Sequence, residues 1–128
     1  MKFQKSLQEL IDEADDVFAR ITKRRESISL YEEALKIARE AEKELETEYL
    51  QGKIALVDEK WEDALNHFEW VVIVNPKFFK GWHYKGFARY ELGKYVESIE
   101  CYDKALEINP QYAEAWSNRG NLLYELGR

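Results

Sequence analysis

Apolar side chains recur along this chain at steps of three, four and seven residues, which places them on one face of an α-helix. The pattern is clearest in residues 82–92 and again in residues 95–108. Gly93 lies between these stretches and can adopt the left-handed conformation that ends a helix. Pro110 has no amide hydrogen and biases Asn109 away from helical angles. The pattern therefore predicts two helices joined by a tight turn, with a second turn after them.

This helix pair repeats with a period of 34 residues. Glycines, Asn-Pro pairs, tryptophans and Leu-Gly pairs return in one register: Gly52, Gly86 and Gly120; Asn75-Pro76 and Asn109-Pro110; Trp82 and Trp116; Leu92-Gly93 and Leu126-Gly127. Gly86 lies inside a predicted helix, where glycine costs up to about 1 kcal/mol relative to alanine. We therefore expect a neighbouring helix to approach it closely, at the small residues Ser98 and Ala105. Aromatic side chains would fill the volume around this contact: Trp82, Tyr95 and Tyr102.

With these residues in place, the chain resembles the tetratricopeptide repeat family. Its pattern is matched in residues 79–112 by Trp82, Gly86, Ser98, Tyr102, Ala105 and Pro110. It is matched in residues 45–78 by Gly52, Ala64, Phe68 and Pro76, and in residues 113–128 by Trp116, Gly120 and Gly127. Departures are Glu48 for Trp, Val71 for Ala, Glu59 for the turn Gly, and Gln51, Lys85 and Arg119 for the usual Leu.

The first third of the chain reads as a degenerate repeat. "SISLYEEALKIA" (27–38) parallels "SIECYDKALEIN" (98–109), but Val71 follows Ala34 by 37 residues rather than 34. Because no proline follows, we expect the second helix of this unit to be longer than usual. It either bends near Lys43, which we favour, or continues unbroken into Tyr49. An apolar stripe upstream predicts the first helix of the unit: Phe3, Leu7, Leu10, Ala14, Val17 and Ile21.

The resemblance implies an all-α fold: a right-handed superhelical stack of antiparallel helix pairs, a solenoid of about seven helices. Residues 1–128 would form one domain, with a degenerate first repeat (1–44), two repeats (45–78 and 79–112) and a terminal helix or truncated repeat (113–128). That last helix either caps the stack or belongs to a longer array. Its apolar stripe favours a longer array or pairing with another copy: Trp116, Leu122, Leu123 and Leu126.

Composition narrows the function classes. The chain is 45% hydrophobic, which is ample for a core, and its net charge is −6, with 19 basic against 25 acidic residues. A protein that grips a phosphate backbone needs a basic face, so we expect no nucleic-acid partner. No apolar run approaches the roughly 18 residues of a membrane span. The start of the chain has no signal-peptide apolar region, and the single Cys101 excludes an internal disulfide. These features predict a soluble cytoplasmic domain.

The sequence offers little for catalysis. Its two histidines, His67 and His83, and Cys101 show no metal-ligand spacing, so we expect no metal and no cofactor. His67 and Cys101 read as structural residues. The carboxylate pairs Asp15-Asp16 and Asp58-Glu59 read as solvated surface, because a general acid–base pair needs a pocket with opposed environments. We therefore expect no catalytic residue and no enzyme activity.

The resemblance also implies a binding surface, because the family binds partner peptides on the concave side lined by the first helix of each pair. The candidate groove residues are Tyr49, Lys53, Lys80, His83, Tyr84, Phe87, Tyr90, Asn118 and Asn121. We favour a groove with Tyr49, Tyr84, Phe87 and Tyr90 as its floor and Lys53 and Lys80 pairing an acidic group. Alternatively, these rings pack against neighbouring repeats and show only their edges.

One branch of the family clamps the acidic C-terminal tails of chaperones with Lys, Asn and Arg. The corresponding residues here are Tyr49, Lys53, Tyr84, Glu114 and Asn118, or, one unit earlier, Asp12, Asp16, Leu50, Lys80 and Tyr84. Neither set forms the clamp, so a chaperone tail is disfavoured. The leading hypothesis is a protein-interaction module for a partner of unknown identity. The alternative is self-assembly through the C-terminal helix or the N-terminal helices, with no separate ligand.

Overall fold

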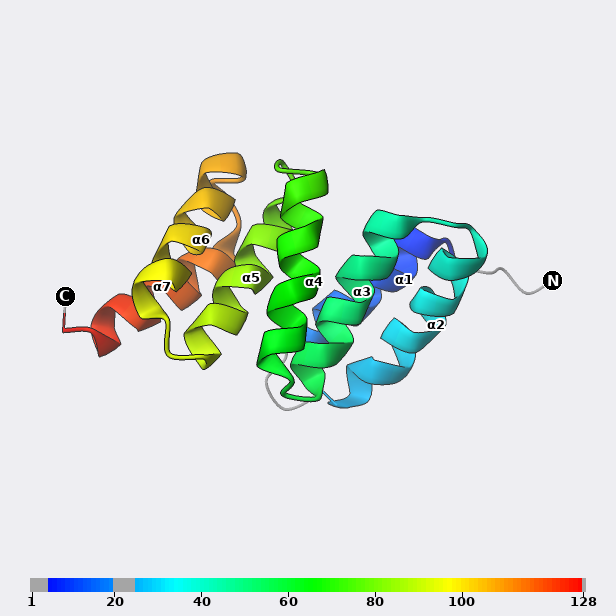
Figure 1. Ribbon diagram of the computed structural model, residues 1–128, viewed down its shortest axis with the longest axis horizontal. Helices are drawn as coiled ribbons and strands as arrows, with labels where there is room; N and C mark the ends of the chain where they lie inside the picture. The colour runs from blue at the N-terminus through cyan, green and yellow to red at the C-terminus, as the bar shows by residue number, and fades with distance from the viewer. Residues whose placement is uncertain (1–4, 20–24, 128) are drawn as a thin grey trace.

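The computed structural model describes residues 5–19 and 25–127. In this part of the chain every regular element is a helix, and successive helices run back and forth along a stack (Figure 1). The first helices of the pairs are α1 (Leu7–Ala19), α3 (Glu44–Val57), α5 (Phe79–Glu91) and α7 (Ala113–Glu125). The second helices are α2 (Ile28–Glu40), α4 (Trp61–Val74) and α6 (Tyr95–Ile108), and a 3-10 turn, η2 (Arg25–Ser27), precedes α2. The predicted all-α solenoid is confirmed.

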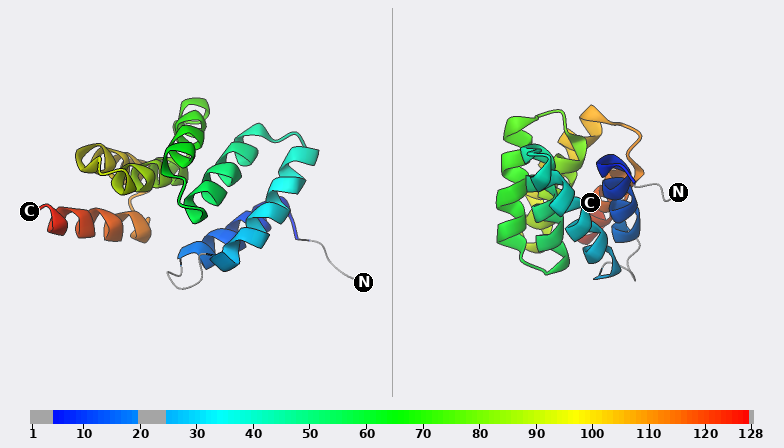
Figure 2. Two further views of the ribbon diagram at one scale, coloured as in Figure 1. Left: turned by 60° about the horizontal axis from the view of Figure 1, so that its bottom comes forward. Right: turned by 90° about the vertical axis from the view of Figure 1, so that its right-hand side faces the viewer.

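The stack is curved. Figure 2 shows α1 and α7 on the same side of the molecule, with α4 on the opposite side. The inner side of this curve is where residues of α1, α3 and α5 meet, as described below. None of the helices in residues 5–19 and 25–127 is long and apolar enough to span a membrane.

The turns between paired helices share one geometry, whichever residue occupies the key position. Gly93 has φ +79°, and the amide of Lys94 donates to the carbonyl of Arg89 at 2.8 Å. Glu59 replaces this glycine after α3, yet it adopts φ +60°, and the amide of Lys60 donates to Ala55 at 2.9 Å. A left-handed glutamate costs roughly 1–2 kcal/mol. The surrounding helices therefore impose the turn without the help of glycine.

The second helix of the first repeat differs in length from the prediction, although the repeat ends where it was expected to end. α2 spans 13 residues against 14 in α4 and α6, so the prediction of a longer helix is wrong. The helix does continue to Glu40, but its start is replaced by the 3-10 turn η2. The favoured bend near Lys43 is present, because Glu42 adopts φ +55° before α3 begins at Glu44. Phe3 and Ile21 of the predicted first stripe lie outside the described residues.

The turn between pairs explains why asparagine, proline and tryptophan stay in register. α4 ends at Val74, and the side-chain oxygen of Asn75 accepts from the amide of Lys77 at 3.2 Å. The indole N–H of Trp82 donates to the carbonyl of Pro76 at 2.7 Å. The second copy of the turn repeats both bonds: Asn109 with Gln111 at 3.1 Å, and Trp116 with Pro110 at 2.7 Å. Trp82 is therefore partly exposed and hydrogen-bonded to the turn, rather than buried in the core as predicted.

Two of the three repeated glycines make the expected close contacts. A Cβ on Gly52 would lie 2.7 Å from ring atoms of Phe68, and a Cβ on Gly86 would lie 2.9 Å from the Tyr102 ring. The hydroxyl of Ser98 also donates to the Gly86 carbonyl at 2.7 Å, which ties α6 to α5. A Cβ on Gly120 would meet no atom within 4 Å in the described part of the chain beyond its own helix backbone. At this register position a ring of the following helix thus covers the glycine in two pairs, whereas no such ring among the described residues covers the glycine of α7.

This difference predicts opposite effects of one substitution. Gly52→Ala and Gly86→Ala should each lower the free energy of unfolding by about 1–3 kcal/mol, because the added methyl overlaps a buried ring. Gly120→Ala is the matched control, and it should raise stability by up to about 1 kcal/mol, since it removes only the glycine cost in a helix. Urea denaturation followed by circular dichroism measures all three. Equal effects at the three positions would contradict the packing account.

Candidate functional site

A buried carboxylate on α1 holds the inner face together. Asp15 is 6% exposed and accepts hydrogen bonds from the hydroxyls of Tyr31 and Tyr49, each at 2.7 Å. It also accepts from Lys80 Nζ at 2.9 Å, and Lys53 Nζ lies 3.5 Å away. These partners come from α2, α3 and α5, so one side chain joins four helices. The prediction that Asp15 belongs to the solvated surface is wrong.

The chain had a local signal for this carboxylate. Leu7, Ile11 and Asp15 are spaced four residues apart, which places them on one face of α1. Ile11 is buried on that face, and Asp15 is buried with it. An acidic residue in an apolar stripe indicates a buried partner, but the partners themselves lie on other helices and cannot be read from α1 alone.

The pKa values in this cluster reflect two opposing effects, the burial of the charged groups and their pairing with one another. Burial raises the pKa of Asp15, but the ammonium groups of Lys53 and Lys80 and the Tyr31 hydroxyl outweigh it and hold the pKa below its usual value. Burial lowers the pKa of Lys53 to about 7, although Asp15 opposes that shift. The Lys53 ammonium also lies 3.2 Å from the centroid of the Tyr84 ring, a cation–π contact. The charges of this cluster are therefore directed at one another.

His83 forms a second buried contact, between α5 and α7. Its Nε2 lies 2.9 Å from the side-chain nitrogen of Asn118, and its Nδ1 lies 3.4 Å from the Tyr112 hydroxyl. Burial, with the charge of Lys53 nearby, lowers the pKa of His83 to about 3, so the imidazole is neutral at pH 7. His83 thus links two repeats and does not face the solvent.

Most of the predicted groove floor is covered. Tyr49, Tyr84 and Phe87 are buried, so the prediction of an exposed aromatic floor is wrong for them, and the groove candidates Lys53 and His83 are buried as well. The rings pack on one another and on α4: the centroids of Tyr49 and Tyr84 are 6.2 Å apart, and those of Phe68 and Tyr84 are 5.9 Å apart. The alternative interpretation, in which aromatics pack between repeats, describes these residues. The curve of the stack is tight enough to bury the inner positions of α3 and α5.

The remaining predicted residues lie closer to the solvent. Lys80 is partly exposed, but its ammonium is paired with Asp15 rather than left for an acidic partner. The Tyr90 hydroxyl donates to Glu125 on α7 at 2.8 Å. Asn118 is bonded to His83, and Asn121 is exposed. The structure therefore does not gather the nine predicted residues into one open groove.

One recess stays open beside the Asp15 cluster. It has a volume of about 380 Å³ and lies between α1, the start of α3 and the segment 75–80. Its lining is mostly apolar, with a few charged side chains at its edge. The residues that line it are Gln8, Ile11 and Asp12; Leu45, Glu46 and Tyr49; Asn75, Phe78, Phe79 and Lys80. Binding sites for small groups commonly combine an apolar lining with a few polar groups. Sequence reasoning missed its α1 wall and its Phe78 and Phe79 side.

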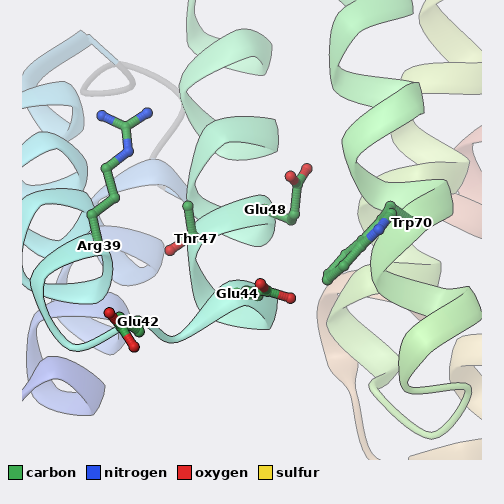
Figure 3. Close-up of a pocket in the computed structure, with 6 residues that line it drawn as sticks. All are labelled: Arg39, Glu42, Glu44, Thr47, Glu48 and Trp70. Atoms are coloured by element: carbon green, nitrogen blue, oxygen red, sulfur yellow. The ribbon is translucent and has the colours of Figure 1, made fainter.

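A larger hollow of about 670 Å³ lies between the end of α2, the start of α3 and α4 (Figure 3). Figure 3 shows the Trp70 ring facing Glu44 and Glu48 of α3. Glu48 is already engaged, because its carboxylate lies 2.6 Å from His67 Nδ1. The other lining residues are polar: Arg39, Glu42 and Thr47. No group of three or more His, Cys, Asp or Glu in residues 5–19 and 25–127 could hold a metal ion.

Comparison with known proteins agrees with this architecture. The family model described as TPR repeat matches residues 86–127. The fold is that of a tetratricopeptide repeat protein. Proteins with such repeats commonly mediate protein–protein interactions. No curated protein sequence matches the chain.

Three solved structures illustrate the likeness. The first TPR of Spaghetti (RPAP3), bound to an HSP90 peptide, is 20% identical with a TM-score of 0.66, covering 95% of this chain and 94% of that one. The Sgt2 TPR domain from Aspergillus fumigatus is 21% identical with a TM-score of 0.66, covering 97% and 81%. A thermophilic TPR protein in Thermus thermophilus is 20% identical with a TM-score of 0.71, covering 95% and 66%. At these identities the likeness concerns the fold.

The Asp15 cluster generates a stability prediction. Asp15→Asn should lower the free energy of unfolding at pH 7 by about 1–3 kcal/mol, because it removes the buried carboxylate that accepts from Tyr31, Tyr49 and Lys80. Glu100→Gln, at an exposed position on α6, is the control and should change stability by less than about 0.5 kcal/mol. Urea titrations measure both.

The same cluster sets the direction of a pH effect. Because folding lowers the pKa of Asp15, its contribution is present above about pH 4 and is lost as the pH falls through the lower folded-state value. The difference in unfolding free energy between the wild type and Asp15→Asn should therefore shrink below pH 4. A difference that stays constant between pH 7 and pH 2 would contradict the assigned ion pairing.

Proposed function

We propose that this chain is a protein-interaction module that binds a segment of a partner protein on its inner face, at the recess between α1, α3 and α5. The observation that carries the proposal is that recess: an apolar concavity of about 380 Å³ left open beside the buried inner side chains Lys53, Tyr84 and Phe87. Its lining is packed in place, because Tyr49 lies against Phe78 with ring centroids 5.1 Å apart. A pre-formed apolar pocket can take a side chain without first reorganising.

The likeness to a peptide-bound TPR supports the same use of the fold. Of the residues predicted from the sequence, Tyr49 and Lys80 line the recess. Tyr90, Asn118 and Asn121 lie outside it, and we assign them no contact with the partner. Lys80 would act at the edge, held in place by Asp15.

Site-specific crosslinking tests this assignment. A photo-crosslinking amino acid at Gln8, an exposed residue at the edge of the recess, should capture a partner in a lysate of the source organism. The same amino acid at Glu100, exposed on α6, is the matched control and should capture nothing in common with it. Mass spectrometry of the crosslinked peptide identifies the segment. Capture from the α6 position alone would place the binding surface elsewhere.

A second candidate function is self-association through α7. Its support is the open register position at Gly120, flanked by Trp116 at 50% and Tyr124 at 85% exposure. The equivalent positions Gly52 and Gly86 are each covered by a ring of the following helix. A helix from another copy could cover Gly120 in the same way.

Sedimentation velocity over a wide concentration range tests this candidate. Self-association would produce species larger than 15.2 kDa, and Tyr124→Glu would restore the monomer. Val96→Glu, at an exposed apolar residue of α6, is the control and should leave the larger species unchanged. A single 15.2 kDa species at all concentrations would eliminate self-association.

A further inference from the structure

We propose that the segment bound in the recess carries one large apolar side chain flanked by lysine or arginine residues. This inference rests on the proposed function and specifies the chemistry of the partner. It follows from two properties of the recess, the shape of its apolar floor and the sign of the charges at its edge.

The floor suits a single large side chain. Ile11 and Tyr49 are buried beneath it, and Leu45, Phe78 and Phe79 form partly buried sides. The volume of about 380 Å³ lies at the small end of the roughly 300–1,000 Å³ range of ligand pockets. It therefore matches one aromatic or long aliphatic side chain together with the backbone that carries it. Burying such a side chain removes its apolar surface from water, which favours binding.

The edge has a net negative charge toward a partner. The Asp12 side chain is 60% exposed, and Glu46 is partly exposed in the first turn of α3. Lys80 is the cation at this edge, but its ammonium lies 2.9 Å from Asp15 and 4.0 Å from Asp12. Its charge is thus already directed at the protein's own carboxylates. Two carboxylates, one from α1 and one from α3, at the edge of an apolar recess complement basic residues that flank an apolar anchor.

The same charges disfavour an acidic tail. The peptide bound by the Spaghetti TPR, SRMEEVD, ends with three acidic residues among its last four. Such a segment in this recess would bring its carboxylates toward Asp12 and Glu46, and like charges in close contact cost affinity. Neither Lys53 nor Lys80 could receive it without giving up Asp15. The recess therefore selects against the ligand that its structural neighbour binds.

Fluorescence anisotropy with designed peptides tests the inference. Three labelled peptides share one backbone: a central phenylalanine between lysine pairs, the same phenylalanine between glutamate pairs, and a central alanine between lysine pairs. The wild-type chain should bind the first at least tenfold more tightly than either of the others. Equal or tighter binding of the glutamate peptide would overturn the proposal, and so would equal binding of the alanine peptide.

Charge reversal separates the recess from the overall charge of −6. The double variant Asp12→Lys with Glu46→Lys should lose at least tenfold in affinity for the lysine–phenylalanine peptide and gain affinity for the glutamate peptide. The control, Glu32→Lys with Glu100→Lys, makes the same change in net charge at exposed residues of α2 and α6 and should keep the original order. The double variant Asp12→Asn with Glu46→Gln removes both negative charges without adding a lysine, and it should bind the lysine–phenylalanine peptide with intermediate affinity. An identical loss in recess and control variants would overturn the proposal.

A displayed random peptide library distinguishes the failure of this inference from the failure of the proposed function. Enriched peptides with apolar anchors and basic flanks, which lose binding to the recess variant, would support both. Enriched acidic peptides that still depend on Asp12 and Glu46 would overturn the partner chemistry and leave the recess as the binding site. Enriched peptides that bind the recess variant and the wild type equally would overturn both.

Discussion

The stack depends on one contact made twice, an aromatic ring of a second helix lying against a glycine of the helix before it. Phe68 occupies the space where Gly52 has no side chain, and Tyr102 does the same at Gly86. This contact lets the backbones of each pair approach closely, because a Cβ at either glycine would overlap the ring. The small residues at 64, 98 and 105, all fully buried, keep the rest of each contact close. The curve of the molecule is built from these repeated offsets.

The curvature of the stack determines which side chains of the inner face are buried and which are exposed. It brings α1 close enough to α5 for Asp15 to reach Lys80, and it covers the rings of Tyr49 and Tyr84. A wider curve would have left an aromatic groove with two lysines at its surface. The tighter one uses those lysines internally and leaves a recess whose exposed charges are Asp12 and Glu46. The character of the surface is therefore opposite in sign to the one that the residue types alone indicated.

The repeat could be predicted because its causes are local. Pro76 and Pro110 stand two residues after the ends of α4 and α6, where a proline cannot continue the helix, and a mid-helix glycine at a fixed interval indicates close packing. The bond from Trp82 to Pro76 spans six residues and recurs at Trp116, so the motif contains its own explanation. The left-handed turn at Glu59 could be predicted from the alignment with Gly93, although glutamate itself does not favour it.

The candidate site could not be predicted in the same way. Lys80 follows Asp15 by 65 residues, and their meeting depends on the summed rotation of the two steps from the first pair to the third. A small error in each offset would separate them. His83 likewise is buried and bonded to Asn118 of α7, which no feature of its own helix indicates. Burial of inner residues is thus a property of the whole curve, whereas burial within a pair is a property of the repeat.

The bonds of Asp15 to other repeats also change how stability is shared among the repeats. In a linear array of repeats, each unit gains stability from its immediate neighbours alone, so the ends can open while the middle persists. Here a residue of the first unit is bonded directly to the third, past the second. Opening the first pair therefore exposes a charge buried against α5, and the three units are bound into a single cooperative block rather than a row of separable ones.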